Sequence, residues 1–107
     1  MTDLRKLARG RDCLVRLPSV CNGNPETTVL AHYRLAGLSG MGIKADDLFG
    51  AWACSSCHNY IDTHHDAETR LAHAEGVFRT LAAIKRMGLV SVISAIWPST
   101  REGTNND

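Results

Sequence analysis

Two thiols and an imidazole stand together in the segment Cys54-Ser55-Ser56-Cys57-His58. Two residues between cysteines let both thiolates reach one tetrahedral ion, and soft sulfur ligands favour zinc. Cys13 and Cys21 would complete a four-thiolate shell in the pattern C-x7-C-x32-C-x2-C. Their separation is longer than the usual two to four residues, so this pair is the weaker indication. We predict a structural zinc site formed by Cys13, Cys21, Cys54 and Cys57.

The four cysteines have other interpretations. Cys13 and Cys21 could be small buried hydrophobic residues, or the four thiols could form two disulfides. Disulfides are disfavoured because the first residues run directly into a polar stretch without the apolar segment of an export signal, which predicts a cytoplasmic location. A redox protein using Cys54 and Cys57 ranks last, since such a pair seldom comes with two further thiols and an adjacent histidine.

A histidine and an arginine lie two residues apart in the strand-like stretch Thr28-Val29-Leu30-Ala31-His32-Tyr33-Arg34. Side chains alternate across a strand, so His32 and Arg34 would share one face. An imidazole that takes a proton from water and a guanidinium that holds a phosphate oxygen are groups that phosphodiester hydrolysis could use. For a lone histidine, an ordinary structural role is the more frequent explanation. The order of strand histidine, connection, cysteine turn and helix favours the catalytic one.

The elements that must position these residues fall into three parts of the chain. Over residues 12–44 the pattern predicts strands and turns, with a short strand at 13–17, a β-prone stretch at 27–35 and a flexible connection at 37–42. The cysteine turn should open a short helix, on which His58 and Asp62 share a face.

The third part predicts a long amphipathic helix over residues 66–87. Its apolar face is expected to contain Leu71, Ala74, Phe78, Leu81 and Ile84 or Lys85. Residues 63–66 fit a capping box and Gly88 is a stop signal. A last strand is predicted at 89–96 and a disordered tail at 99–107. The longest apolar stretch, 89–97, is too short to cross a bilayer, so no membrane association is expected.

Composition fits one small α+β domain over residues 1–107. With 44% hydrophobic residues but few aromatics, its core would be stabilised considerably by a metal. The net charge of +1 gives no indication of a partner, but basic residues gather in an N-terminal arm, about 1–11. We expect this arm to contact only phosphate groups, and therefore to be dispensable for folding, although such clusters are as often merely solvated. The predicted contact residues are Arg5, Lys6, Arg9 and Arg11.

The strand histidine followed by Cys54-Ser55-Ser56-Cys57-His58 resembles the HNH, or ββα-metal, nucleases. Several segments resemble more closely the small phage and prophage nucleases of the YbcO type. These segments are Arg11-Asp12-Cys13, Pro18-Ser19-Val20-Cys21, Gly40-Met41-Gly42-Ile43-Lys44 and Cys54 to Asp62. The closer resemblance spans about residues 8–85 and rests on the set, since no single motif identifies it.

The resemblance implies a zinc-stapled ββα-metal (HNH-like) domain with a long C-terminal amphipathic helix. It implies that His32 is the general base, that His58 binds a catalytic Mg²⁺ or Mn²⁺, and that Asp62 is a second ligand or its neighbour. Two positions depart from the family pattern. Ala31 replaces an expected ligand before the base, and the middle asparagine has no clear counterpart, the nearest residues being Asp46 and Asp47.

We therefore expect single-metal hydrolysis of DNA phosphodiester bonds, with His32 activating water and Arg34 holding the backbone. DNA binding should be largely independent of sequence, and the biological setting would be phage or prophage DNA recombination or processing in the bacterial cytoplasm. A homodimer is left open. The chief alternative is a non-catalytic zinc-binding module that binds DNA or a replication or recombination protein, which explains the cysteines equally well.

Overall fold

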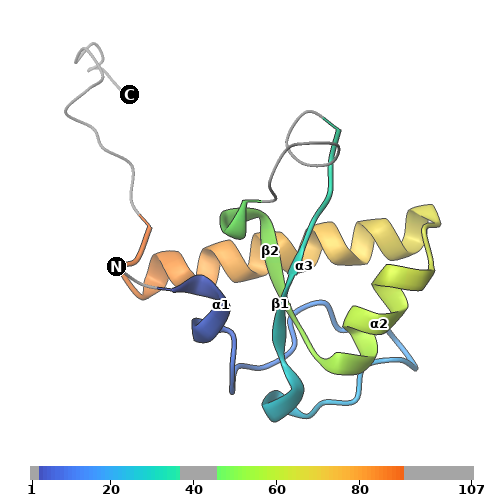
Figure 1. Ribbon diagram of the computed structural model, residues 1–107, viewed down its shortest axis with the longest axis horizontal. Helices are drawn as coiled ribbons and strands as arrows, with labels where there is room; N and C mark the ends of the chain where they lie inside the picture. The colour runs from blue at the N-terminus through green and yellow to red at the C-terminus, as the bar shows by residue number, and fades with distance from the viewer. Residues whose placement is uncertain (1–2, 37–45, 91–107) are drawn as a thin grey trace.

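A computed structural model describes residues 3–36 and 46–90 of the chain (Figure 1). The described part contains the helices α1 (Leu4–Leu7), α2 (Ser55–Thr63) and α3 (Ala67–Arg86), the strands β1 (Val29–His32) and β2 (Gly50–Ala53), and the short 3-10 helices η1 (Pro25–Thr27) and η2 (Asp47–Phe49). The connection predicted at 37–42, most of the strand predicted at 89–96 and the tail at 99–107 lie outside the described residues. The small α+β architecture predicted from the sequence is confirmed.

The two strands form an antiparallel pair that α3 crosses on one side (Figure 1). The register places Val29 opposite Ala53 and His32 opposite Gly50. Small residues bring the helix close to the sheet: a Cβ atom on Gly76 would lie 3.2 Å from the Cβ of Ala51. The backbone N–H of Trp52 donates a hydrogen bond to Thr80 Oγ1 at 2.9 Å. This packing fixes the middle of α3 against β2.

Local side chains determine where α3 begins and ends. Asp66 is its N-cap and accepts a hydrogen bond from the Thr69 backbone N–H at 2.7 Å. The predicted capping box at 63–66 is wrong, because the Thr63 hydroxyl instead donates to Asn59 O within α2. Gly88 adopts a φ of 77°, and the next N–H returns to Ile84 O, so the predicted stop signal is confirmed.

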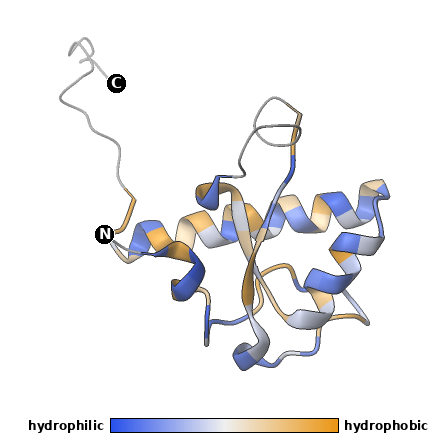
Figure 2. Cartoon of the chain, viewed as in Figure 1, coloured by the Kyte–Doolittle hydropathy of each residue, from blue (hydrophilic) through white to orange (hydrophobic). Residues whose placement is uncertain are grey.

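The buried face of α3 agrees with the predicted apolar face only in part. Ile84 is buried and Leu81 packs against the core, as predicted. Leu71 and Phe78 are 59% and 69% exposed, although both were expected in the core. The buried residues are Thr69, His73, Gly76, Val77, Thr80 and Ile84. Close contact with the sheet requires small side chains and polar groups that satisfy the backbone, and Thr80 and His73 supply the latter. Hydrophobic and hydrophilic residues consequently alternate in short runs along α3 (Figure 2).

The strand predicted at residues 13–17 is wrong. The chain there is irregular, because Arg16 and Ser19 adopt left-handed backbone conformations with φ of 54° and 63°. A strand cannot continue through such residues, although Leu14 N–H still donates to Trp52 O at 2.7 Å. Val15 and Leu17 nevertheless lie in the core, so the segment packs as predicted by its apolar residues but without strand geometry. The β-prone stretch at 27–35 contains β1.

The N-terminal segment packs into the fold, whereas the sequence predicted a basic arm that contacts only phosphate groups. Asp3 caps the four-residue helix α1, and Ala8, which directly follows α1, is completely buried. Leu4 and Leu7 pack with Ala8 against a small core cluster that contains Trp52 and Ile84. Apolar residues at this helical spacing face the same side, which explains why the segment is held. Among helices of the described ranges, none has the length and hydropathy needed to span a bilayer.

Candidate functional site

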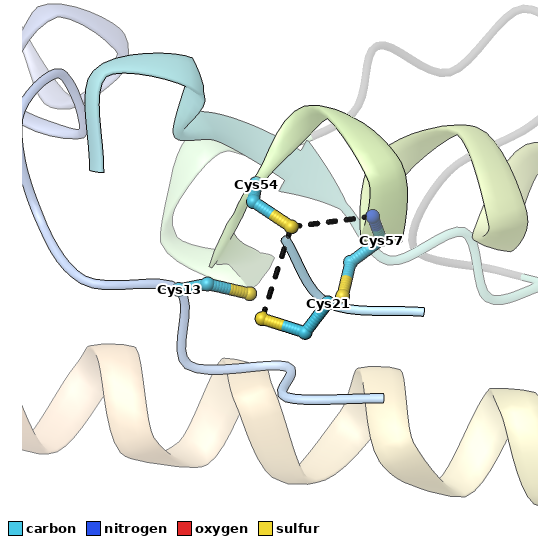
Figure 3. Close-up of side chains that lie close together, drawn as sticks. All are labelled: Cys13, Cys21, Cys54 and Cys57. Atoms are coloured by element: carbon cyan, nitrogen blue, oxygen red, sulfur yellow. Dashed lines mark hydrogen bonds between the residues drawn. The ribbon is translucent and has the colours of Figure 1, made fainter. Parts of the chain in front are cut away.

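The four cysteines gather at the N-terminal end of α2, where their sulfur atoms point toward one another (Figure 3). All four sulfur atoms lie within 4.8 Å of one another, and Cys21 Sγ is 3.9 Å from Cys54 Sγ. A Zn–S bond of about 2.3 Å implies sulfur atoms about 3.8 Å apart around a tetrahedral ion. The cysteines are free thiols. The predicted meeting of the four is therefore confirmed, and their donor set fits a zinc ion.

Cys54 is both a candidate ligand and the N-cap of α2. Its sulfur accepts hydrogen bonds from the backbone N–H groups of Asn22 and Cys57, both at 3.4 Å. Burial raises the pKa of the Cys54 thiol, but these N–H donors, together with hydrogen bonds from the thiols of Cys57 and Cys21, outweigh burial and bring the pKa down to about 7. Burial raises the pKa of Cys57 and of Cys21. A cation among the sulfurs would favour the thiolate form of all four.

Further hydrogen bonds, each to a side-chain hydroxyl, also join the two cysteine segments. Asn22 Nδ2 donates to Ser55 Oγ and Ser56 Oγ, each at 3.1 Å. The Ser55 backbone N–H donates to Thr27 Oγ1 at 3.2 Å. The loop that contains Cys21 is thus fastened to the start of α2 independently of any ion, which pre-arranges the four sulfur atoms.

A polar cavity of about 230 Å³ lies toward the other end of α2. It is enclosed by the end of β1, the C-terminal part of α2 and the first turns of α3. Its lining consists of His32, Arg34, Ile61, Asp62, His64, His65, Thr69, Arg70 and His73. Three predicted site residues, His32, Arg34 and Asp62, therefore meet at one cavity. His58 is not part of its lining.

His32 forms the shortest polar side-chain contact of the cavity region. Its Nε2 lies 2.6 Å from Asp47 Oδ1. The antiparallel register explains this contact: His32 pairs with Gly50, so the residues just before β2 lie beside the histidine. Of the two acids that the sequence left open, Asp47 is the one that contacts His32. Asp46 instead caps η2 by accepting the Leu48 backbone N–H at 2.8 Å.

The groups around Asp47 favour its ionised form. The hydrogen bond to His32 lowers the pKa of Asp47, and burial opposes this only in part, while the charge of Arg5 adds to it. Arg5 Nε is 3.6 Å from Asp47 Oδ1. An ionised carboxylate at Nε2 keeps the proton of a neutral imidazole on that nitrogen, which leaves Nδ1 of His32 as the proton acceptor. The pair can therefore supply a general base.

His58 and Asp62 lie together as their helical spacing predicts. Their Nε2 and Oδ2 atoms are 3.6 Å apart, and both side chains are substantially exposed. Within residues 3–36 and 46–90, the cysteine cluster is the one group of three or more metal-ligating side chains close enough for an ion. His58 and Asp62 form a pair rather than a complete ligand set.

Sequence reasoning missed several residues of the cavity. His73 is buried, and its Nε2–H donates to Ala31 O at 2.9 Å. The Arg70 guanidinium lies 4.9 Å from the centroid of the Tyr33 ring, and its Nη2 is 3.5 Å from Arg34 O. The i, i+3 spacing of Arg70 and His73 on the predicted helix was the available signal, but nothing in the sequence indicated which helix face meets β1.

Of the predicted phosphate-binding residues, two make contacts within the protein. Arg5 pairs with Asp47, as described. Arg11 Nε donates to Leu7 O at 3.2 Å, and its guanidinium lies 5.6 Å from the Trp52 ring centroid. The side chains of Lys6 and Arg9 are exposed. Lys6 and Arg9 are therefore the better placed to bind a phosphate.

Comparison with known proteins identifies relatives over most of the chain. A protein-family model described as "Putative nuclease YbcO" matches residues 2–89. The chain belongs to the YbcO family. Two YbcO relatives, from Escherichia coli (strain K12) and Enterobacteria phage 82, are each 51% identical over 94 residues, covering 84% of this chain and 98% of the relative. Both are described as a "Putative nuclease".

A solved structure also resembles this YbcO-family chain. It is described as "Structure of a putative bacteriophage protein from Escherichia coli str. K-12 substr. MG1655". The similarity has a TM-score of 0.67 and 46% identity, covering 80% of this chain and 100% of the solved one. The closer of the two family resemblances seen in the sequence is thus confirmed, whereas the wider resemblance to HNH nucleases stays a prediction.

Proposed function

We propose that this chain is a metal-dependent nuclease of the HNH-like (ββα-metal) kind that hydrolyses DNA phosphodiester bonds. The observation that carries the proposal is the hydrogen-bonded pair of His32 and Asp47 beside a cavity that also contains Arg34 and Asp62. The ββα order of β1, β2 and α2 supports it, as does the word nuclease in the descriptions of the relatives.

His32 would take a proton from the attacking water through Nδ1. Asp47 would stabilise the imidazolium that forms, because its carboxylate stays ionised. Arg34 and Arg70, which both line the cavity, would hold the phosphate oxygens. Asp62, with His58 one turn earlier on α2, would hold a Mg²⁺ or Mn²⁺ ion. When bound, such an ion stabilises the charge that develops on the phosphate and the leaving oxygen.

The cysteine cluster has a structural part in this proposal. Zinc bound by the four thiolates would fix the start of α2 against the loop that contains Cys21. Since α2 also contains Asp62, the ion would determine where that carboxylate lies relative to β1. Lys6, Arg9 and Arg34 would contact the DNA backbone without reading bases, so binding should weaken with salt.

Cleavage assays with matched variants test the proposal. Wild-type protein should cleave supercoiled plasmid, or single-stranded or branched DNA, with Mg²⁺ or Mn²⁺ and not with EDTA. His32→Ala should abolish cleavage while leaving zinc content and DNA affinity unchanged. Asp47→Asn should slow cleavage by about tenfold or more, since an amide does not stabilise an imidazolium as a carboxylate does. Asp46→Asn is the control and should cleave normally.

His58→Ala separates the two metal sites. If His58 binds the catalytic ion, the variant should lose cleavage and bind Mg²⁺ or Mn²⁺ more weakly, yet retain zinc. Release of zinc would place His58 in the structural shell instead. Absence of cleavage by wild-type protein with every metal and DNA form would contradict the nuclease and favour the non-catalytic zinc-binding module.

A further inference from the structure

A tyrosine and a histidine are stacked at the C-terminal end of α2. The ring centroids of Tyr60 and His64 lie 3.7 Å apart, and the two ring planes differ by 2°. His64 is the C-cap residue of α2, and its side chain is exposed. Because the two rings are parallel and in contact, Tyr60 covers one face of the imidazole and leaves the opposite face to another group.

Hydrogen bonds fix the orientation of this imidazole. His64 Nδ1 lies 3.1 Å from Tyr60 O and 2.9 Å from Thr63 Oγ1. A carbonyl oxygen only accepts hydrogen bonds, so Nδ1 carries a proton and is the donor. The Thr63 hydroxyl in turn donates to Asn59 O at 3.0 Å. The ring plane of His64 is therefore held before any ligand binds, which lowers the entropic cost of using it as a binding surface.

The stacked pair separates two cavities. Tyr60 lines a cavity of about 340 Å³, together with Leu17, Pro18 and Val20. His64 instead lines the polar cavity of about 230 Å³, and Tyr60 is not part of that lining. Since the two rings lie against each other and line different cavities, the imidazole face opposite Tyr60 is the one turned toward the polar cavity.

The polar cavity combines positive charge with apolar surface beside this ring. Arg34 and Arg70 line it, and Ile61, three residues before His64 on α2, adds an apolar side chain. A nucleotide has the matching parts, a charged phosphate and a flat base. Proteins bind single strands by stacking bases on rings beside basic groups that follow the backbone. In a duplex the faces of each base are covered by its neighbours, so an unpaired base is the one that can stack here.

We propose that His64 is a stacking surface for an unpaired base, and that the chain acts on single-stranded DNA, including the unpaired part of branched DNA. This inference rests on the proposed function, because it makes His64 a specificity-determining residue of the same site. His32 lines the same cavity, so the unpaired base would belong to a nucleotide next to the phosphodiester bond that is cleaved.

Equilibrium binding tests the inference without relying on cleavage. The measurement uses fluorescence anisotropy with labelled DNA and no added Mg²⁺ or Mn²⁺. His64→Ala should lower the affinity for a single strand by about fivefold or more, the scale of one base stacked on a ring. Its affinity for the duplex of the same sequence should stay unchanged. A 2-aminopurine base in the single strand should lose fluorescence through stacking when wild-type protein binds, and should lose less with His64→Ala.

Two further variants separate stacking from charge. His64→Phe keeps a flat ring without a charge and should bind the single strand as wild-type protein does. His64→Lys keeps a cation without a ring and should bind as weakly as His64→Ala. Because His64 is exposed, none of these changes removes a core side chain. Circular dichroism and zinc content check that each variant folds.

The outcomes distinguish this inference from the proposed nuclease. Full affinity of His64→Lys together with a loss in His64→Phe would show that His64 binds through charge, and would overturn the stacking. Equal losses for single strand and duplex in His64→Ala, or no loss for either, would overturn the selection of an unpaired base. Binding with the expected pattern but no cleavage of any DNA would contradict the nuclease and still support the stacking surface.

Discussion

At the residue scale, His73 connects the polar cavity to the core. Its side chain is buried against the sheet, its Nε2–H donates to Ala31 O, and its ring lies 5.0 Å from that of Tyr33. Burial lowers the pKa of His73 below its ordinary 6.5, and the nearby charge of Arg70 acts in the same direction. The folded protein therefore keeps this imidazole neutral where an unfolded chain would protonate it.

This difference predicts an acid-dependent loss of stability. Below pH 6.5 the unfolded state takes up the proton first, so the free energy of unfolding should fall until the pH reaches the lowered pKa of folded His73. Above pH 6.5 this residue should contribute no pH dependence. His73→Gln retains a donor for Ala31 O but cannot titrate, so urea unfolding from about pH 7.5 to pH 5 should show a shallower slope.

His65→Gln is the control, since His65 is exposed and should leave the slope unchanged. Equal pH dependence of wild-type protein and His73→Gln would show that His73 is not responsible.

The His32–Asp47 pair shows how far individual residues can be predicted. Strand alternation placed His32 and Arg34 on one face, and both line the cavity. The partner of His32 could not be chosen between two adjacent acids, because that choice depends on the β1–β2 register across a connection of unknown course. A shift of one residue in a register reverses which side chain faces a neighbour, and single-sequence patterns do not resolve such a shift.

At the element scale, α1 and the residue that follows it determine what the N-terminus contributes. Because Ala8 is fully buried and Leu4 and Leu7 pack against Trp52, deleting residues 1–9 should destabilise the protein. The expected loss is about 2 kcal/mol or more in the free energy of unfolding, from the apolar area exposed. Denaturant unfolding measures it. An unchanged midpoint would restore the view of a dispensable arm.

A double variant separates packing from charge. Lys6→Ala with Arg9→Ala changes only exposed side chains, so its stability should match that of wild-type protein. Its DNA affinity should fall, and the slope of affinity against salt should decrease by about one for each phosphate group that the variant no longer neutralises.

The helix α3 shows why its length was predictable and its orientation was not. Its limits follow from local chemistry, the cap at Asp66 and the left-handed Gly88. Its buried face follows from how closely the backbone approaches the sheet, which favours Gly76 and Thr80 over bulky residues. Hydrophobic periodicity alone selects Leu71 and Phe78, although both are exposed, and it cannot show which face of a helix meets the sheet.

At the scale of the whole molecule, the cysteine cluster joins segments that are far apart in sequence. Removal of zinc by a chelator should therefore destabilise the entire domain, because metal binding and folding are coupled in small structural sites. Cys57→Ser should release zinc and abolish cooperative unfolding. Cys13→Ser should do the same if the widely spaced N-terminal pair completes the shell. Zinc content and thermal melting measure both effects.

Ser56→Ala removes one hydrogen bond from Asn22 but no sulfur, so it provides the comparison and should retain zinc. An unchanged melting temperature together with unchanged metal content in Cys13→Ser would remove Cys13 from the proposed shell.

The position of the cysteine cluster along the chain has a consequence for folding order. An ion shared by Cys13 and Cys57 would close a loop that contains β1, β2 and η2, and with them His32 and Asp47. Closing a loop restricts the conformations of the unfolded chain. Pairing β1 with β2 inside that loop would therefore cost less conformational entropy. Asp62 on α2, and the whole of α3 with Arg70, lie beyond this loop. One half of the cavity could then assemble under the constraint of the metal, while the other half would have to dock onto it.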